Sequence, residues 1–315
     1  MGRAMKSDFP ADIEHTFRIE SELGVGGSGS VYKAWHSRLQ KFVVIKEVKH
    51  SSADGNEIRR NEVEALKNVK NAYLPQVFDF LADDNRSFSV MEFIEGESFD
   101  KLLKRGQKYS QAQVRKWYGQ LASALEAIHK QNIYHRDIKP ANVMLTPGGD
   151  VCLIDFNAAL VGGNDSKLIN RSLGYASPEQ YEIFKHYENV CNERKSRNKP
   201  AAGENMRDNV KTDFIENDNT TEFSSGACID DYSGEIAPIW HIDWKRSDIY
   251  SLGATMYHLL TGKHPPKHTQ ETAWVFRHAD YEDSIIYIIE KSVSADPAER
   301  YKSAEALSAA LQTLD

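Results

Sequence analysis

Twelve residues near the middle of the chain, YHRDIKPANVML (134–145), place an acid, a base and an amide within six positions. The carboxylate of Asp137 can accept a proton from a hydroxyl group, and the ammonium of Lys139 can neutralise a phosphoryl group in transfer. The amide oxygen of Asn142 can bind a magnesium ion. Each residue is also common in loops that have no catalytic function, where an aspartate usually caps a turn. The chemical interpretation therefore depends on whether other phosphate-binding and metal-binding positions accompany this string.

Two further strings offer such positions. The first, LGVGGSGSV (23–31), packs four glycines into six positions, and each costs roughly 0.5–1 kcal/mol of backbone entropy when it is fixed in regular structure. Close approach of the backbone to a phosphate chain would explain the cluster, and a flexible turn or linker is the alternative. The second, VCLIDFNAAL (151–160), is an apolar strand that ends at Asp155. Magnesium needs only one or two carboxylates beside phosphate oxygens, so Asp155 is well placed to bind it.

Strands dominate the elements expected before residue 95. Alternating apolar and polar residues predict short antiparallel strands over 17–24, 31–35 and 41–48. Residues 57–69 have helical spacing, and residues 75–94 predict a hairpin that turns at Asp83–Arg86. The apolar positions of the helix are Ile58, Val63, Leu66 and Val69.

Helices dominate the rest of the chain. Residues 110–131 predict a long amphipathic helix, and residues 248–262 predict a second, apolar one that ends at its glycine. Residues 296–301 predict a helical turn capped by Asp296. The N-cap and the apolar face of the first helix are Ser110 and Val114, Trp117, Leu121, Leu125 and Ile128.

Composition narrows the function further. The chain has 315 residues, 40% of them hydrophobic, which is enough for two lobes with sizeable cores. Its net charge of −7 provides no broad basic field for nucleic acid or anionic lipid, so any phosphate site is local. The three cysteines are scattered at 152, 191 and 228, without zinc-ligand spacing, which fits a reducing cytoplasm. No apolar run reaches 18 residues, so no membrane span is expected in this chain, and nothing indicates an oligomeric state.

Taken together and in this order, the strings resemble those of eukaryotic-like serine/threonine protein kinases, of the kind common in bacteria. The resemblance runs from about Phe17 to the C-terminus and implies an α+β, bilobal protein-kinase fold. Its expected parts are an N-terminal tail (1–12), a small β-rich N-lobe with one key helix (13–94) and a larger helical C-lobe (95–315). It also implies transfer of the ATP γ-phosphate to Ser/Thr hydroxyls of proteins, this one included, with Mg²⁺ or alternatively Mn²⁺ as the metal ion.

The resemblance implies a role for each phosphate-site residue. Asp137 would act as the base and Lys139 would face the phosphate, while Asn142 and Asp155 would bind the metal ion. Lys46 of VVIK would contact the α- and β-phosphates and pair with Glu62. The lid over the triphosphate would be formed by Gly24, Gly26 and Gly29.

The adenine end of the site follows from the same resemblance. Val31 and Met144 would enclose the base, and Met91 would be the gatekeeper beside a hinge formed by Glu92 to Ile94. For Val31, Met91 and Met144, the residues alone support plain core packing equally well. The remaining implied contacts are structural, namely a pair between Glu179 and Arg300 and an anchoring role for Asp248 at the catalytic loop.

Several positions depart from the family pattern. Asn157 stands where a glycine usually follows Asp-Phe, and Val44 replaces the usual alanine above adenine. Asparagine tolerates positive φ better than most residues, so the turn can persist with less flexibility. Ser172 supplies the hydroxyl expected near Asp137, and Ser166 is a candidate phosphorylation site.

A polar stretch interrupts the resemblance at about 182–240. Its apolar residues are few and follow neither a helical nor a strand period, which predicts disorder or a loose loop. We expect it to tune partner choice or to accept phosphate, and a passive linker is the alternative. The acceptor hydroxyls considered are those of Ser196, Thr220, Ser224 and Ser225.

Two other function classes compete with an active protein kinase. A pseudokinase would bind nucleotide and partners without turnover, but it usually lacks the lysine, the base or the metal-binding aspartate, and Lys46, Asp137 and Asp155 are all present. A small-molecule kinase of related fold would typically lack Lys139 and the SPE string at 177–179. Both features favour a protein hydroxyl as the acceptor.

Overall fold

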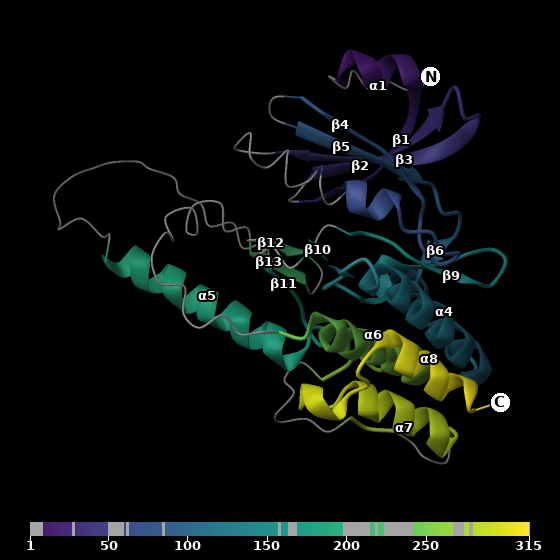
Figure 1. The fold of residues 1–315 in the computed structure, drawn as a ribbon, viewed down its shortest axis with the longest axis vertical. Helices are drawn as coiled ribbons and strands as arrows, with labels where there is room; N and C mark the ends of the chain where they lie inside the picture. Colours follow the sequence, from purple (N-terminus) through teal and green to yellow (C-terminus); the bar gives the residue numbers. More distant parts are fainter. Residues whose placement is uncertain are drawn as a thin grey trace. The chain divides into compact units, whose positions relative to one another are not determined.

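The computed structural model describes most of the chain in twelve ranges, and the statements below concern these residues. They are 9–26, 29–49, 60, 63–83, 86–156, 159–162, 169–197, 215–217, 220–223, 242–266, 274–276 and 280–314. The chain forms two compact units, and the boundary between them lies between Ile94 and Glu95 (Figure 1). The short segment Asn71–Leu74 also belongs to the second unit.

The first unit is built on an antiparallel sheet of five strands in the order β1-β2-β3-β5-β4. The three strands predicted near the N-terminus are present, and so is the following hairpin, in which the amide of Asp83 donates to the carbonyl of Arg86 at 2.9 Å. Residues 63–67 are helical, and Val63, Leu66 and Val69 are buried as predicted, while Ile58 lies outside the described residues. The strands are β1 (Phe17–Gly26), β2 (Gly29–His36), β3 (Lys41–Lys49), β4 (Val77–Ala82) and β5 (Arg86–Glu92).

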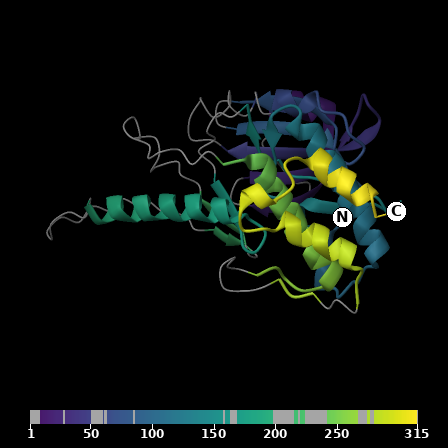
Figure 2. The same cartoon turned by 60° about the horizontal axis from the view of Figure 1, so that its bottom comes forward.

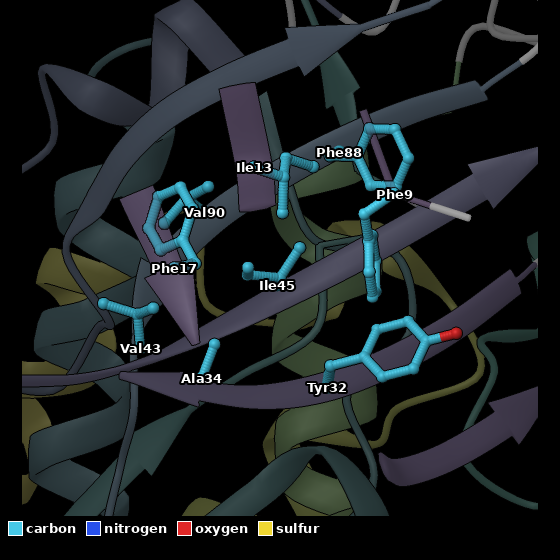
Figure 3. Packing of buried hydrophobic residues seen from close by; sticks show 9 residues of the cluster. All are labelled: Phe9, Ile13, Phe17, Tyr32, Ala34, Val43, Ile45, Phe88 and Val90. Atoms are coloured by element: carbon cyan, nitrogen blue, oxygen red, sulfur yellow. The ribbon is translucent and has the colours of Figure 1, made fainter. Parts of the chain in front are cut away.

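One face of this sheet is covered by the start of the chain. The short helix α1 (Ala11–Thr16) brings Ile13 onto the sheet, and Phe9 just before it meets Tyr32 edge to face at 5.1 Å between ring centroids. Figure 3 shows these side chains gathered with Ile45 and Phe88. The tail expected to extend to residue 12 therefore ends earlier. Phe9 precedes Pro10, the N-cap of α1, so no helical spacing relates it to Ile13, and the sequence offers no period that marks the two residues as core.

The second unit is mainly helical, as predicted. Helix α4 (Gln111–His129) begins with a capping box at Ser110, and all five residues of its predicted apolar face are buried. Helix α6 (Trp244–Thr261) begins four residues before the predicted start and ends at Gly262, whose φ of 67° suits a glycine. Asp296 caps the turn η2 through the amide of Ala298. The other helices are α3 (Phe99–Lys104), α7 (Asp283–Ser292) and α8 (Ala304–Gln312).

Short strands position the loops between these helices. Strands β6 (Glu97–Ser98), β8 (Val143–Leu145) and β9 (Val151–Leu153) form one small sheet, and β7 (Ile133–Tyr134) pairs with β10 (Leu160–Val161). The turn η1 (Pro140–Asn142) leads directly into β8. Among the described residues, no helix is both long enough and apolar enough to cross a membrane.

The polar stretch does not begin as a loose loop. Helix α5 (Pro178–Arg197) continues 15 residues past Glu182, and Figure 2 shows it running away from α6 and α8. Its sequence is rich in Glu, Gln, Lys and Arg, which favour helices even without an apolar stripe, and proline at the first position starts a helix well. Further on, β12 (Ile215–Asn217) and β13 (Thr220–Phe223) form a sheet with β11 (Ile169–Ser172). The prediction of a loose loop was wrong for these parts, because a polar composition without an apolar period does not exclude a helix or a strand.

Candidate active site

In the second unit, the side chains of Ser172 and Lys139 both contact the buried carboxylate of Asp137. The hydroxyl of Ser172 donates to Asp137 Oδ1 at 2.5 Å. The ammonium of Lys139 lies 2.9 Å from Asp137 Oδ2 and 3.1 Å from the Ser172 hydroxyl. The expected proximity of Ser172 to Asp137 is therefore confirmed. An alcohol, a carboxylate and an ammonium meet at one point, which is the set of groups that hydroxyl activation beside a phosphoryl group requires.

Asn142 fixes the orientation of the same carboxylate. Its side-chain amide nitrogen donates to the backbone carbonyl of Asp137 at 2.8 Å and to Asp137 Oδ2 at 3.0 Å. Because the nitrogen is directed at Asp137, the amide oxygen points away from it. Asn142 thus holds the carboxylate in place and keeps an oxygen ligand for another partner.

Asp248 anchors the backbone of the loop that carries Asp137, as the resemblance implies. It is fully buried on α6 and accepts hydrogen bonds from the amides of His135 and Arg136 at 2.9 and 2.8 Å. Its Oδ2 also lies 2.9 Å from His129 Nε2. Arg136 has a φ of 62°, a conformation that is uncommon outside glycine. The two backbone bonds to Asp248 stabilise this strained geometry immediately before Asp137.

A second anchor was not predicted from the sequence. The side chain of Gln180 donates to the carbonyl of Arg136 at 2.9 Å, so the start of α5 is bound to the loop that carries Asp137. Gln180 Oε1 also accepts from the amide of Ser177 at 3.1 Å and the hydroxyl of Ser247 at 3.2 Å. A buried glutamine needs such partners, but its burial is known only from the structure, and the sequence shows Gln180 only as the residue after the SPE string.

Asp155 and Asn142 lie at the same end of one hairpin. Strands β8 and β9 pair with Val143 opposite Leu153, and the amide of Ile154 donates to the carbonyl of Asn142 at 2.8 Å. Asp155 follows directly, with a φ of 68°. One carboxylate and one amide oxygen fit magnesium, which takes its other ligands from water and phosphate. Within the described ranges no group of three or more His, Cys, Asp or Glu side chains gathers for a metal ion, and Asn157 is outside those ranges.

In the first unit, strand register brings the predicted nucleotide residues onto one face. Val31 lies opposite Lys46, and Val44 lies opposite Met91. Opposed residues share a face, and so do Val44 and Lys46, which are two positions apart. This face is the reverse of the one that α1 covers. Glu62 lies outside the described residues, so its pair with Lys46 stays a prediction.

Different physical causes explain why glycine stands at each of these positions in the β1–β2 hairpin. Gly24 pairs with Val31 and Gly26 with Gly29. A Cβ on Gly29, whose φ is 150°, would collide with the backbone carbonyl of Glu47 on β3. Close packing between strands therefore explains Gly29 without any phosphate. A Cβ on Gly24 would meet open space, so packing within the protein does not explain that glycine.

The predicted hinge residues occupy the end of β5 and the chain just after it. The amide of Glu92 donates to the carbonyl of Gln76 at 2.8 Å, and its carboxylate accepts from the amide of Gln76 at 3.1 Å. The backbone group through which Glu92 would contact a base is therefore its carbonyl. Ile94 is half-buried in this unit, and Met144 is half-buried on β8 in the other.

The segment after Ser172 is fixed by two buried polar contacts. Arg300 binds Glu179 through both ends of its guanidinium, at 2.6 and 3.0 Å, which confirms the predicted pair. The hydroxyl of Tyr175 lies 2.6 Å from His258 Nδ1. Burial raises the pKa of Tyr175, and burial together with the nearby His264 lowers the pKa of His258 to about 4. His258 is thus held neutral at physiological pH.

Comparison with known proteins decides the family. The protein kinase domain model matches residues 17–190, more than half of the chain. This chain belongs to the protein kinase family. The resemblance and the α+β fold expected from it are thereby confirmed, with a β-sheet in the first unit and helices in the second. Members of this family generally use ATP and Mg²⁺.

Bacterial relatives are similar over different lengths. A probable serine/threonine-protein kinase from Clostridium acetobutylicum is 35% identical over 176 residues, which cover 53% of this chain and 27% of that protein. A serine/threonine-protein kinase from Myxococcus xanthus is 25% identical over 333 residues, or 96% of this chain and 50% of that protein. Serine/threonine-protein kinase D from Synechocystis is 24% identical over 324 residues, or 95% and 52%. The chain thus spans about half or less of the length of these relatives.

Proposed function

We propose that this protein is an ATP-dependent kinase that phosphorylates serine and threonine hydroxyls of proteins. The observation that carries the proposal is the contact of the Ser172 hydroxyl with Asp137 at 2.5 Å, beside the ammonium of Lys139. An alcohol already occupies the position from which an acceptor hydroxyl would pass its proton. The names of the bacterial relatives support the same activity.

The residues of the second unit divide the work of phosphoryl transfer. Asp137 orients the acceptor hydroxyl and takes its proton, while Lys139 balances negative charge near the acceptor oxygen. Asn142 and Asp155 would hold Mg²⁺, or Mn²⁺ in its place, which neutralises phosphate oxygens when bound. Asp248 and Gln180 act through the loop backbone by keeping Asp137 at its position.

The residues of the first unit support nucleotide binding. Lys46 would bind the α- and β-phosphates with Glu62 as its partner, and Val31 would cover the adenine base on the same sheet face. Gly24 and Gly26 would let the hairpin backbone approach the phosphates, and Gly29 would keep this hairpin close to β3. Glu92, Ile94 and Met144 complete the proposed set of residues around the adenine.

Protein substrates are favoured over small molecules. Small-molecule kinases of related fold typically lack Lys139 and the SPE string that carries Glu179, and both are present here. The net charge of −7 argues against nucleic acid as a substrate. A cytoplasmic location is part of this proposal, and it is consistent with the few, scattered cysteines.

Replacing the proposed base tests the activity. We expect Asp137→Asn to reduce phosphate transfer to a generic protein acceptor by about 10²–10⁴-fold, because general base catalysis contributes that much. Binding of Mg–ATP, measured by calorimetry, should remain close to wild type, since Asp137 acts on the acceptor. Asp100→Asn, at a partly exposed aspartate on α3, is the matched control and should retain full turnover.

Two results would contradict the proposal. Near wild-type turnover by Asp137→Asn would remove Asp137 from the mechanism. A wild-type protein that binds Mg–ATP but transfers no phosphate to any acceptor would be a pseudokinase, the alternative considered above.

A further inference from the structure

Arg136, the residue directly before Asp137, is buried although its side chain is a permanent cation. Its relative exposure is 5%, and a guanidinium does not lose its proton in proteins. Its φ of 62° belongs to a sparsely populated region, and such a conformation persists only where the surrounding structure holds it. The position of Asp137 therefore depends on the contacts that hold its neighbour.

Contacts from two helices hold Arg136. Asp248 in α6 accepts a hydrogen bond from its amide at 2.8 Å, and Gln180 in α5 donates to its carbonyl at 2.9 Å. The side chain has a contact of another kind, because the guanidinium carbon lies 4.9 Å from the ring centroid of Trp244. Trp244 is the first residue of α6. The hydrogen bonds thus fix the backbone of Arg136, and the indole ring holds its charged end.

The first turn of α6 is itself anchored, so the indole ring has a fixed support. Asp243 caps this turn by accepting from the amide of Arg246 at 3.2 Å. The side chain of Arg246 donates to the carbonyl of Pro297 at 2.7 Å, and its own carbonyl accepts from Arg300 at 3.2 Å. Trp244 therefore begins a helix whose first turn is bound to a distant part of the second unit.

We propose that Trp244 is a positioning residue for Asp137, a role that rests on the proposed kinase function. The face of an indole ring is electrostatically negative, and it stabilises a cation more strongly where water is excluded. Without the ring, the guanidinium moves toward water, because a buried charge needs compensation. The backbone of Arg136 then relaxes, and Asp137 leaves the position from which it takes the proton of the acceptor hydroxyl.

The expected effect on turnover follows from the strength of this cation–π contact. We expect Trp244→Leu to lower kcat about 5–30-fold, which corresponds to about 1–2 kcal/mol at 1.36 kcal/mol for each tenfold change. The KM for Mg–ATP should change less than about twofold, since Trp244 acts on the base and not on the nucleotide. Trp244→Phe keeps an aromatic face and should recover most of the lost kcat.

A double-mutant cycle separates positioning from general stabilisation of the fold. Arg136→Met removes the charge and keeps an unbranched side chain. If the ring acts through Arg136, Trp244→Leu should change kcat less than about twofold in the Arg136→Met background, because the contact is already absent. If the two losses multiply instead, Trp244 acts by another route and the proposal is wrong.

Lys291→Met is the matched control for losing a cation–π contact. The Lys291 ammonium lies 4.8 Å from the ring centroid of Tyr301, and neither residue belongs to the loop that carries Asp137. We expect this variant to keep the wild-type kcat. A loss equal to that of Trp244→Leu would show that the effect is not specific to Arg136, and it would contradict the proposal.

Fluorinated tryptophan at position 244 tests the ring even if Trp244→Leu does not fold. Each fluorine withdraws electrons from the face of the ring and changes its volume little. We expect kcat to fall stepwise from the monofluorinated to the trifluorinated residue, while the KM for Mg–ATP stays constant. A flat series would exclude a cation–π role for Trp244.

The acceptor in all of these assays is a generic peptide, which separates the two proposals. If the wild-type protein phosphorylates the peptide and Trp244→Leu does so with the same kcat, the positioning role is wrong and the kinase function stands. If the wild-type protein transfers no phosphate, the kinase function fails and the positioning role fails with it.

Discussion

Replacing Arg300 by methionine should destabilise the second unit strongly. The Arg300 side chain is fully buried and binds the Glu179 carboxylate at 2.6 and 3.0 Å. It also donates to the carbonyls of Ser294, Ala295 and Arg246 at 2.7, 3.2 and 3.2 Å. Methionine approximates the volume but satisfies none of these acceptors, and it leaves a mostly buried carboxylate without its partner.

The expected loss of stability follows from the burial of this ion pair. Removing one partner of a buried ion pair costs about 3–5 kcal/mol, whereas an exposed pair contributes about 0.2–1 kcal/mol. For a unit of this size, 1 kcal/mol shifts Tm by roughly 2–4 °C, so we expect Arg300→Met to lower Tm by about 6–20 °C. Lys130→Met is the control, because Lys130 pairs with Glu126 on the exposed side of α4. We expect it to shift Tm by no more than about 2–4 °C.

Thermal and urea unfolding, followed by tryptophan fluorescence, measure both variants. Four of the five tryptophans belong to the second unit, so the signal reports mainly on the unit that contains Arg300. If Arg300→Met and Lys130→Met lowered Tm equally, the reasoning would be refuted, because burial would then have no effect on the strength of the ion pair. Glu179→Gln should also cost several kcal/mol, since it leaves the buried guanidinium without its counter-charge.

Three further changes test local parts of the fold. Ser110→Ala should lower the free energy of unfolding by about 1 kcal/mol in urea titrations, because it removes the N-cap of α4. Gly29→Ala should cost about 1–3 kcal/mol through its clash with β3, while Gly24→Ala, which meets open space, should change stability by less than about 0.5 kcal/mol. The pKa of His258 is lowered to about 4, so the unfolded chain binds its proton first as the pH falls below about 6.5. The neutral, buried His258 therefore contributes its full stability above pH 6.5, and up to about 3 kcal/mol of it is lost as the pH falls to 4. His258→Gln should flatten this part of the curve of unfolding free energy against pH. An unchanged curve would contradict the burial argument.

Local patterns predicted most of the fold. Periodicity identified the strands of the first unit and the face of α4, because the period of apolar residues is set by backbone geometry within each element. Capping at Ser110 and Asp296 was also predictable, since a cap involves only neighbouring residues. The packing of Phe9 was not predictable, because Phe9 lies before the six-residue helix α1 and belongs to no periodic element.

The residues of the candidate site and some of their contacts were predictable, such as those of Ser172 with Asp137 and of Arg300 with Glu179. The resemblance named Asp137, Lys139 and Ser172, and the structure brings these three together in the second unit. It did not name Gln180, whose partners are separated from it by 44 and 67 positions. Gly29 was interpreted as a phosphate position, although its contact with Glu47 depends on the pairing of β2 with β3. In each case the missing information is which distant segments meet.

The length of the insertion is tolerated because both of its ends are fixed. Glu179 and Asp248 are 69 positions apart, the first bound to Arg300 and the second to the backbone of His135 and Arg136. Relative to a connection of about 10 residues, closing one of this length costs only roughly 2 kcal/mol, since each doubling adds about 0.6 kcal/mol. The Glu179–Arg300 pair alone is expected to cost about 3–5 kcal/mol when it is broken. The ends therefore stay in place while the insertion changes length, so the strand that ends at Ser172 can pair with a strand such as β13 from the same insertion.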